Sequence, residues 1–292
     1  MPLTRGRFAE YSGQTVLSRV GKADAVNLEP SVDAWRLTHR CSEYHLIYGD
    51  NLQAIVIATI GSPSIHVLLE SITQYARDLP VYISANSLEL WGEVRGRLKN
   101  NRVVFRPNTA TNFGDAYNSI VSYAFNHGDY DSLIIANDDV VLAPDTIEKM
   151  QADYKYVSRE FKVGFLGARS DYVLPAQNIR VAEEDDVFSA LKWESELHIK
   201  MTDVIAPIFA AISKEAWETA QFPSTNWYSD NIICHDLNKA GYFHFVSRGY
   251  VHHAGSQTVG TDFAKCHEEP RQWIKTNRPD MYEAIYGTTN PS

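Results

Sequence analysis

The feature that most constrains this chain of 292 residues is a buried strand that ends on two adjacent aspartates. The apolar residues 133–136 (LIIA) are followed by Asp138 and Asp139, and a second apolar run covers residues 140–143. Such a run is typical of a strand covered on both faces of a sheet. Two carboxylates beside it are costly to bury unless a cation compensates them. A divalent metal that also binds a diphosphate fits this need. The alternative is an acidic turn in which Asp139 caps the next helix.

Size and composition are those of an ordinary globular protein, with 44% hydrophobic and 22% charged residues. The 27 basic and 36 acidic residues give a formal charge of −9 without any block of Lys or Arg, which disfavours nucleic-acid binding. No apolar run approaches the roughly 18–20 residues of a membrane span. Cys41, Cys234 and Cys266 are far apart and form no zinc or disulfide pattern. We therefore expect a cytoplasmic protein without a membrane span.

Strand and helix patterns alternate regularly from residue 53 onward. Apolar runs with strand character are separated by stretches with helical spacing, and the strands are 54–61, 81–87, 102–108, 133–136 and 163–168. This alternation predicts an α/β fold with a mostly parallel sheet and helices on both faces. Ligands of such sheets bind at the carboxyl ends of the strands, where the loops 59–62, 85–87, 107–114 and 137–139 should meet.

The pattern changes in the last third of the chain. An apolar strand is predicted at 205–213 and two short strands at 242–246 and 250–253, with helices at 215–220 and 230–240. Residues 255–270 are polar, contain two glycines and show no period, which is typical of a mobile lid. We expect an N-terminal extension packed on the core (1–50), one core domain (51–256), and a C-terminal lid and tail (257–292).

The order of these elements, from residue 54 to 256, resembles that of the GT-A glycosyltransferases, and of the family-2-like inverting enzymes in particular. Asn112, Gly114 and Asn118 reproduce an Asn-x-Gly-x-x-x-Asn segment of that family, and IIANDDVVLAPDTI resembles its metal-binding, DxD-type strand end. The resemblance implies a Rossmann-like GT-A fold with a smaller acceptor-side region near the C-terminus. It also implies a hexosyltransferase that uses a nucleotide-sugar donor.

A third segment, residues 209–242, is similar to the acceptor side of the same family. The family places a catalytic Asp eleven residues before a Gly-aromatic pair, and Asp230 stands eleven residues before Gly241. Three departures accompany this match, because the flanking Glu, second Asp and Arg of the family are replaced by Ser229, Ile232 and Asp236. The resemblance implies that Asp230 is the general base, with Asp236 as a rival; a simple helix N-cap is the alternative role of Asp230.

The resemblance also implies which residues contact the donor. The nucleotide-binding set consists of Thr59, Asn86, Asn112, Gly114 and Asp138. Asn86 stands where relatives often carry an Asp for the base. Its amide presents a donor and an acceptor, so uracil recognition and a UDP-sugar are favoured.

The metal ligands implied by the resemblance are Asp139 and one residue of the pair His252 and His253. Adjacent side chains on a strand point to opposite faces, so only one His can be the ligand, and the family pattern favours His252. Imidazole suits a transition metal, so Mn²⁺ is expected, with Mg²⁺ as the alternative. The competing interpretation is that one His is packed and the other exposed.

The sequence therefore predicts a metal-dependent glycosyltransferase that acts with inversion on an acceptor hydroxyl. A nucleotidyltransferase is one alternative, although the first strand's loop, residues 58–62, carries no Lys or Arg. A non-catalytic nucleotide- or carbohydrate-binding module on the same fold is the other. Neither the sugar nor the acceptor follows from the sequence.

Overall fold

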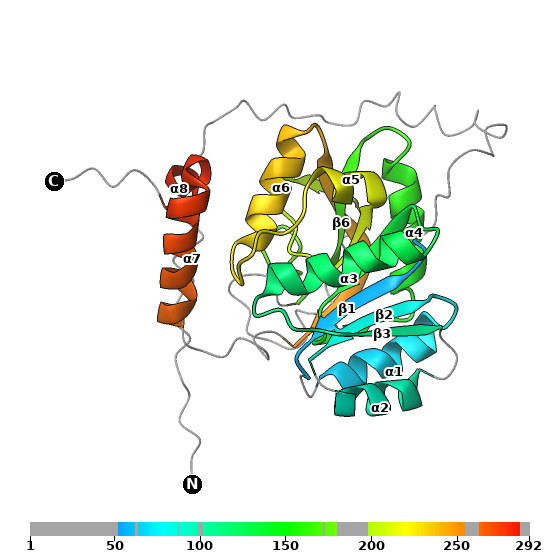
Figure 1. Ribbon diagram of the computed structural model, residues 1–292. Helices are drawn as coiled ribbons and strands as arrows, with labels where there is room; N and C mark the ends of the chain where they lie inside the picture. The colour runs from blue at the N-terminus through cyan, green and yellow to red at the C-terminus, as the bar shows by residue number, and fades with distance from the viewer. Residues whose placement is uncertain are drawn as a thin grey trace, which may run out of the picture. The chain divides into compact units, whose positions relative to one another are not determined.

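The computed structural model describes residues 52–61, 64–86, 88–98, 102–171, 173–179, 198–254 and 263–286 (Figure 1). The elements, in chain order, are β1 Ile55–Thr59, α1 Ile65–Tyr75, β2 Val81–Ala85, α2 Leu88–Arg97, β3 Val103–Pro107, α3 Phe113–His127, β4 Ser132–Ala136, β5 Val140–Leu142, α4 Thr146–Val157, β6 Val163–Ser170, β7 Lys200–Thr202, β8 Phe209–Ser213, α5 Lys214–Thr219, α6 Ser229–Lys239, β9 Phe243–His253, α7 Phe263–Asn277 and α8 Pro279–Tyr286.

These strands form one mixed sheet in the order β3-β2-β1-β4-β8-β6-β9-β5, with β7 paired to β9. The half β3-β2-β1-β4 is parallel throughout. Strand β8 runs opposite to its neighbours β4 and β6, while β6 and β9 are again parallel, and β5 and β7 run against β9. Most strands therefore share one direction, as the alternating pattern predicts, and the α/β fold is confirmed.

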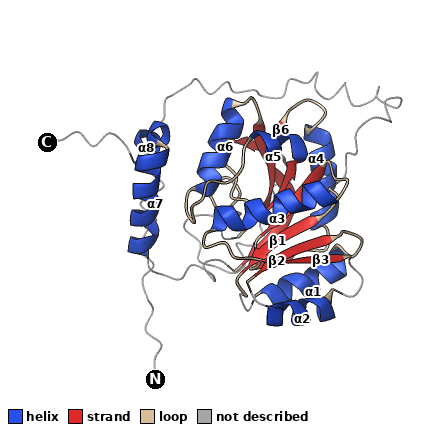
Figure 2. Cartoon of the chain, viewed as in Figure 1, coloured by secondary structure: helices blue, strands red, loops and turns tan. Residues whose placement is uncertain are grey.

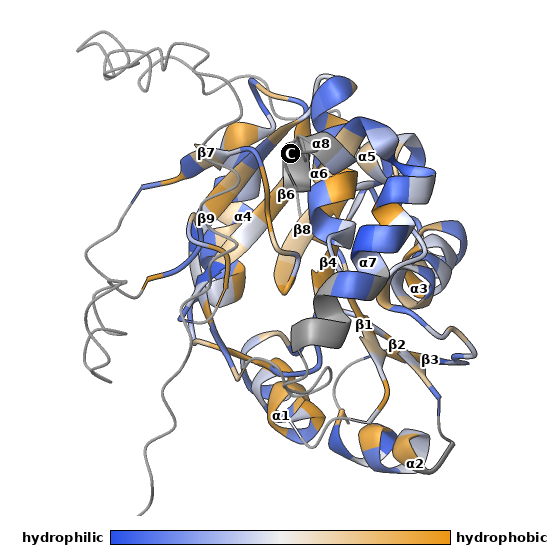
Figure 3. Ribbon diagram, turned by 90° about the vertical axis from the view of Figure 1, so that its left-hand side faces the viewer, coloured by the Kyte–Doolittle hydropathy of each residue, from blue (hydrophilic) through white to orange (hydrophobic). Residues whose placement is uncertain are grey.

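Helices cover both faces of the sheet, with α1 and α2 on one side and α3 on the other (Figure 2). The alternation of side chains along β1 divides the core between these layers. Ile55 and Ile57 pack in the core that includes α1, α2 and α4, whereas Val56 packs in the core that includes α3, α5 and α6. Helices α1 and α3 carry hydrophobic and hydrophilic sides (Figure 3), and their buried apolar residues pack in these two cores.

Three predicted elements differ from the structure. The strand expected at 205–213 is shorter and begins at Phe209, as β8. The strands expected at 242–246 and 250–253 are one strand, β9, interrupted by a bulge. The expected irregular lid at 255–270 is helical from Phe263 onward, where α7 begins and continues through Pro270. The sequence argued for a loop there because residues 255–270 are polar, contain two glycines and show no period. Pro270 lies inside α7, although proline removes a backbone donor and usually ends a helix. Residues 255–262 lie outside the described residues.

Residues 49–270 form one compact unit, and the described residues 271–286 belong to a second one. Within the second unit, Arg271 Nε donates to the Tyr282 hydroxyl at 3.0 Å. The predicted division of the chain at residues 50 and 256 stays a prediction, since residues 1–51 lie outside the described ones. No helix in the described part of the chain is long and apolar enough to cross a membrane.

The buried side chain of His244 makes the stability of this fold dependent on pH. Its Nδ1 accepts the backbone N–H of Phe165 at 3.0 Å, and its Nε2 donates to the carbonyl of Cys234 at 3.1 Å, which fixes the neutral tautomer. Burial lowers the pKa of His244 below its ordinary value, although the Cys234 carbonyl opposes the shift.

We expect the free energy of unfolding to fall as the pH drops below about 6.5, the ordinary histidine pKa, because the unfolded chain takes up a proton that folded His244 resists. The loss from this one group is at most about 1.4 kcal/mol per pH unit. Urea unfolding of the wild type and His244→Gln at pH 7.5 and 5.5 measures it. An equal decline in both proteins would contradict the assignment.

Candidate active site

The two aspartates of the β4–β5 turn lie at the carboxyl edge of the parallel half of the sheet. Asp138 and Asp139 are each only 5% exposed. Asp138 is held by the end of β1, where Thr59 Oγ1 donates to its Oδ2 at 2.5 Å and accepts the Gly61 N–H at 2.9 Å. Asn86 follows Ala85, the register partner of Thr59, and is exposed at the same edge. The structure thus brings Thr59 and Asp138 together and leaves Asn86 open at the neighbouring strand end.

A buried tyrosine supports this turn from α3. The Tyr117 hydroxyl donates to the carbonyl of Ala136 at 2.8 Å, and Ala136 stands two residues before Asp138. Burial raises the pKa of Tyr117 well above its usual value, and the charge of Asp138 raises it further. Tyr117 therefore stays a neutral hydrogen-bond donor beneath the acidic pair.

His253 faces Asp139 across the β5–β9 ladder. Val140 pairs with His253, and the Ala254 N–H donates to the Asp139 carbonyl at 2.9 Å. His253 Nε2 lies 3.1 Å from Asp139 Oδ1. The two atoms lack the geometry of a hydrogen bond, so Oδ1 is buried without a hydrogen-bond partner among the described residues.

This pair fits a divalent metal. An orphaned carboxylate oxygen beside an imidazole nitrogen is costly in a protein interior, and carboxylate plus imidazole is a donor set that Mn²⁺ accepts. No group of three acidic, His or Cys side chains suitable for a metal forms within the described residues. A metal held by Asp139 and His253 would take its other ligands from phosphate and water, as is common for ions that bind nucleotides.

His252 points away from this pair, which corrects the preference drawn from the sequence. Its Nδ1 lies 2.7 Å from Asp171 Oδ2, and the same carboxylate accepts the backbone N–H of His253 at 3.1 Å. Burial by itself would raise the pKa of Asp171, but the bonds from His252 and His253 outweigh it and lower the pKa. The two histidines do face opposite sides of the strand, and the one at Asp139 is His253.

The Asn-x-Gly-x-x-x-Asn segment lies at the start of α3, where it fastens a distant loop to the helix. Asn112 is the N-cap and accepts the Asp115 N–H at 2.9 Å. Asn118 binds both backbone groups of Phe222, at 2.7 and 3.1 Å. A Cβ added to Gly114 would lie 1.8 Å from the Pro223 carbonyl oxygen. In this structure the segment holds residues 222–226, and donor contacts of Asn112 and Gly114 stay predictions.

The fastened loop leads directly into a pocket of about 140 Å³. The pocket opens between α3, the β4–β5 turn and the start of α6. It is lined by residues from four segments of the chain: Phe113, Asn137, Ala206, Pro207, Ile208, Asn226, Trp227, Tyr228, Ser229 and Asp230. Asn137 precedes the acidic pair, so the pocket connects the sequence-predicted base to the sequence-predicted metal turn.

Asp230 stands in the first turn of α6, which begins at Ser229 with Tyr228 as its N-cap residue. Asp230 is therefore not the N-cap; its Oδ1 accepts the N–H of Asn231 at 2.9 Å. The side chain is half-buried in the pocket wall, and this burial raises its pKa above the usual Asp value. Asp236 is not among the residues that line the pocket.

Sequence reasoning missed the aromatic part of this pocket. Trp227 and Tyr228 stand three and two residues before Asp230, and Tyr228 has a φ of 59°, the left-handed conformation that few non-glycine residues adopt. A Trp-Tyr pair just before a suspected base was the available signal. Such strained positions cluster at functional sites because neighbouring structure must hold them in place.

No protein-family model matches the chain, and no curated protein matches its sequence. Solved structures do resemble it. The structure of GalNAc-T7 with UDP, GalNAc and Mn²⁺ matches with a TM-score of 0.55 and 13% identity, over 80% of this chain and 50% of that one. The structure of S. aureus TarS 1–349 in complex with UDP-GlcNAc matches with a TM-score of 0.52 and 9% identity, over 77% and 66%.

These likenesses establish the fold: the chain has the GT-A fold of glycosyltransferases, as its motifs predict. It spans half of the GalNAc-T7 chain and just under two thirds of the TarS chain. The placement of the acidic turn at the carboxyl edge of the sheet defines the candidate active site of this fold.

We expect Gly114→Ala to destabilise the protein, because its new Cβ would meet the backbone of Pro223. A loss of about 1–3 kcal/mol is usual for such overpacking. Gly96→Ala is the matched control, since nothing lies within 4 Å of a Cβ at Gly96 in α2 and the change should stabilise the helix by up to about 1 kcal/mol. Urea unfolding followed by tryptophan fluorescence measures both, and equal effects would contradict the packing role of Gly114.

Proposed function

We propose that this protein is an inverting glycosyltransferase that moves a sugar from a nucleoside diphosphate donor, preferably a UDP-sugar, to an acceptor hydroxyl with the help of a divalent cation. The observation that carries the proposal is the acidic β4–β5 turn. There, Asp139 Oδ1 is buried beside His253 without a hydrogen bond from the described residues, and Asn137, which precedes the acidic pair, lines the same pocket as Asp230. The UDP and Mn²⁺ present in the similar structures support the same donor and ion.

Each residue of the turn has a distinct part in this proposal. Asp138, oriented by Thr59, would contact the ribose hydroxyls, the role that the family resemblance implies for it. Asp139 and His253 would hold the cation, which when bound neutralises negative charge on the diphosphate leaving group. The parallel strands present these groups at one edge, where the donor binds in folds of this kind.

Asp230 would act as the general base toward the acceptor hydroxyl. A base must lie within hydrogen-bond reach of the proton it removes, and Asp230 is the carboxylate in the pocket wall. Its raised pKa favours this role, because a carboxylate with higher proton affinity removes a hydroxyl proton more effectively. Trp227 and Tyr228 line the same space and offer flat apolar surface to the face of a sugar ring.

Two alternatives remain distinct from this proposal. A nucleotidyltransferase would need a cation for the phosphates in the loop after β1, and Thr59, Ile60 and Gly61 supply none there. A binding module without catalysis was suggested by the departures around Asp230. However, Ile232 is buried on the inner side of α6, so its replacement of an acidic residue suits packing. A thermal-shift panel of nucleotide sugars with Mn²⁺, followed by turnover of the stabilising donor, separates the three.

We expect Asp139→Ala to abolish the Mn²⁺-dependent part of UDP binding, because the variant loses a ligand of the proposed metal. Isothermal titration with UDP should give the variant the same affinity in Mn²⁺ as in chelator. Asp129→Ala, which changes an exposed aspartate, is the control and should bind as the wild type. Equal UDP affinity of the wild type with Mn²⁺ and with chelator would remove the metal from the proposal.

We expect Asp230→Asn to retain donor affinity and to lower kcat by roughly 10²–10⁴, the usual contribution of general acid–base catalysis. The acid limb of the wild-type kcat profile should lie above about pH 3.9, the ordinary Asp pKa, because burial raises the pKa of Asp230. Asp236→Asn is the control and should leave kcat unchanged. Loss of turnover in that control, or a product with retained anomeric configuration, would contradict the assignment.

A further inference from the structure

Strand β9 contains more residues than its parallel neighbour β6 over the same length. Gly167 of β6 pairs with Val246, and Arg169 pairs with Tyr250, so β6 advances two residues while β9 advances four. The two additional residues are accommodated by residues 247–249, called here the β9 bulge. Bulges of this kind re-aim the side chains that follow them along the strand.

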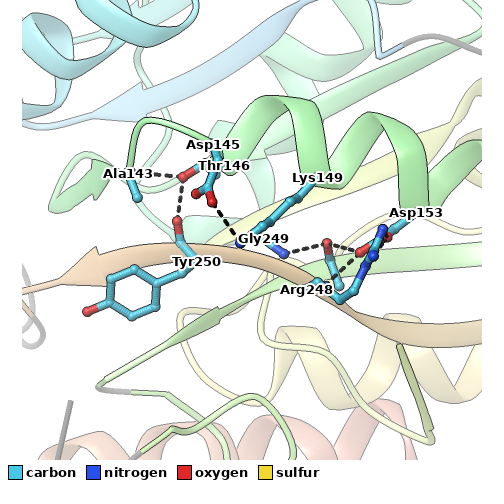
Figure 4. A network of polar contacts seen from close by, with 9 residues as sticks. Ala143, Asp145, Thr146, Lys149, Asp153, Arg248, Gly249 and Tyr250 are labelled. Carbon is cyan, nitrogen blue, oxygen red and sulfur yellow. Dashed lines mark hydrogen bonds and ion pairs between the residues drawn. The ribbon is translucent and has the colours of Figure 1, made fainter. Parts of the chain in front are cut away.

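One buried carboxylate holds the β9 bulge. Asp153 of α4 is fully buried, and its Oδ2 accepts the Ser247 hydroxyl at 2.8 Å and the Arg248 backbone N–H at 2.7 Å. Its Oδ1 accepts Arg248 Nε at 2.7 Å and lies 2.5 Å from Nη2 (Figure 4). The carboxylate therefore satisfies the backbone, hydroxyl and guanidinium donors of the bulge at once.

The start of α4 fixes the strand immediately after the bulge. Thr146 Oγ1 donates to the Tyr250 carbonyl and accepts the Ala143 N–H at 2.8 Å (Figure 4). A Cβ added to Gly249 would lie 2.7 Å from Met150 Cγ and 3.0 Å from the Thr146 carbonyl oxygen, so a larger residue would force the bulge or the helix to shift. Helix α4 thus fixes both the number of residues in the bulge and where β9 resumes.

The size of the bulge decides which histidine meets Asp139. Beyond the bulge, Val140 pairs with His253 and Val141 with His252, and residues directly opposite one another share a face of the sheet. Because side chains alternate along a strand, a shift of one residue exchanges the faces of every residue that follows. A bulge with one residue fewer would bring His252 to the position opposite Val140.

We propose that Asp153 is a positioning residue for the metal site: by holding the β9 bulge at its present size, it directs His253, and not His252, toward Asp139. This inference rests on the proposed function, because it assigns Asp153 a role through a ligand of the proposed metal. The role explains why Asp153 is a carboxylate although it has no exposed surface: it binds the part of β9 that precedes the two histidines.

The test is a Mn²⁺ titration of the full chain, followed by the EPR signal of the free ion. In the otherwise unchanged chain, His253→Ala should weaken Mn²⁺ binding and His252→Ala should not. Asp153→Asn should weaken binding about tenfold or more, the usual effect of changing a residue that orients a metal ligand. In the Asp153→Asn background, adding His252→Ala should weaken the remaining binding further. Pulsed EPR of the bound ion should detect a coordinated ring nitrogen in the wild type and in His252→Ala, and should not detect one in His253→Ala.

Asp145→Asn is the matched control, because Asp145 precedes the same helix, pairs with Lys149 and, within the described part of the chain, forms no hydrogen bond or ion pair with residues 247–249. It should bind Mn²⁺ as the wild type does. If Asp153→Asn does not fold, Ser247→Ala removes the hydroxyl that donates to Asp153 and accepts the Gly249 N–H at 2.9 Å, without leaving a charge unpaired, and binding should weaken in the same direction. Unchanged Mn²⁺ affinity in folded Asp153→Asn, or in Ser247→Ala, overturns the inference. Unchanged affinity in His253→Ala instead overturns the proposed metal site itself.

Discussion

The rest of the structure depends on how two adjacent carboxylates are kept at the carboxyl edge of a buried sheet. Asp138 and Asp139 follow a strand without exposed residues, and each needs a partner that compensates its lost hydration. Asp138 has one in Thr59, at the end of the neighbouring strand. Asp139 has an imidazole nitrogen nearby but no hydrogen bond to the nearer oxygen. The difference between the two environments explains why Asp139 is the member suited to a cation.

Helix α3 and the loop at residues 222–226 connect this edge to the pocket. Tyr117 reaches the end of β4 from one side of the helix, and Asn118 holds Phe222 from another. Helix α3 thus holds both the turn with Asp138 and Asp139 and the loop that leads to Asp230, although these segments are about 90 positions apart in the chain. Precise spacing between reacting groups is worth several kcal/mol in catalysis, so a shared rigid support suits an enzyme that brings a donor and an acceptor together.

Much of the parallel half of the sheet could be predicted from the sequence, because each buried strand is a short apolar run with a helix-forming stretch after it. The acidic pair could be predicted for the same reason, since carboxylates after such a run need a compensating partner. The choice between His252 and His253 could not. It depends on the β9 bulge, whose stabilising carboxylate, Asp153, lies about 100 positions earlier, and local patterns carry no trace of that contact. Helix α7 was missed because residues 255–270 are polar, contain two glycines and show no helical period.

Tyr228 shows what such a pocket demands of the chain that builds it. Its left-handed backbone is unfavourable for a bulky residue by roughly 1–2 kcal/mol, and glycine at this position would relieve that cost. Glycine would also remove an aromatic wall of the pocket. Selection for stability and selection for ligand contact therefore act in opposite directions on a single codon. Among homologous chains, an aromatic residue here would mark a pocket still in use, and glycine would mark a chain that keeps the scaffold after its ligand has been lost.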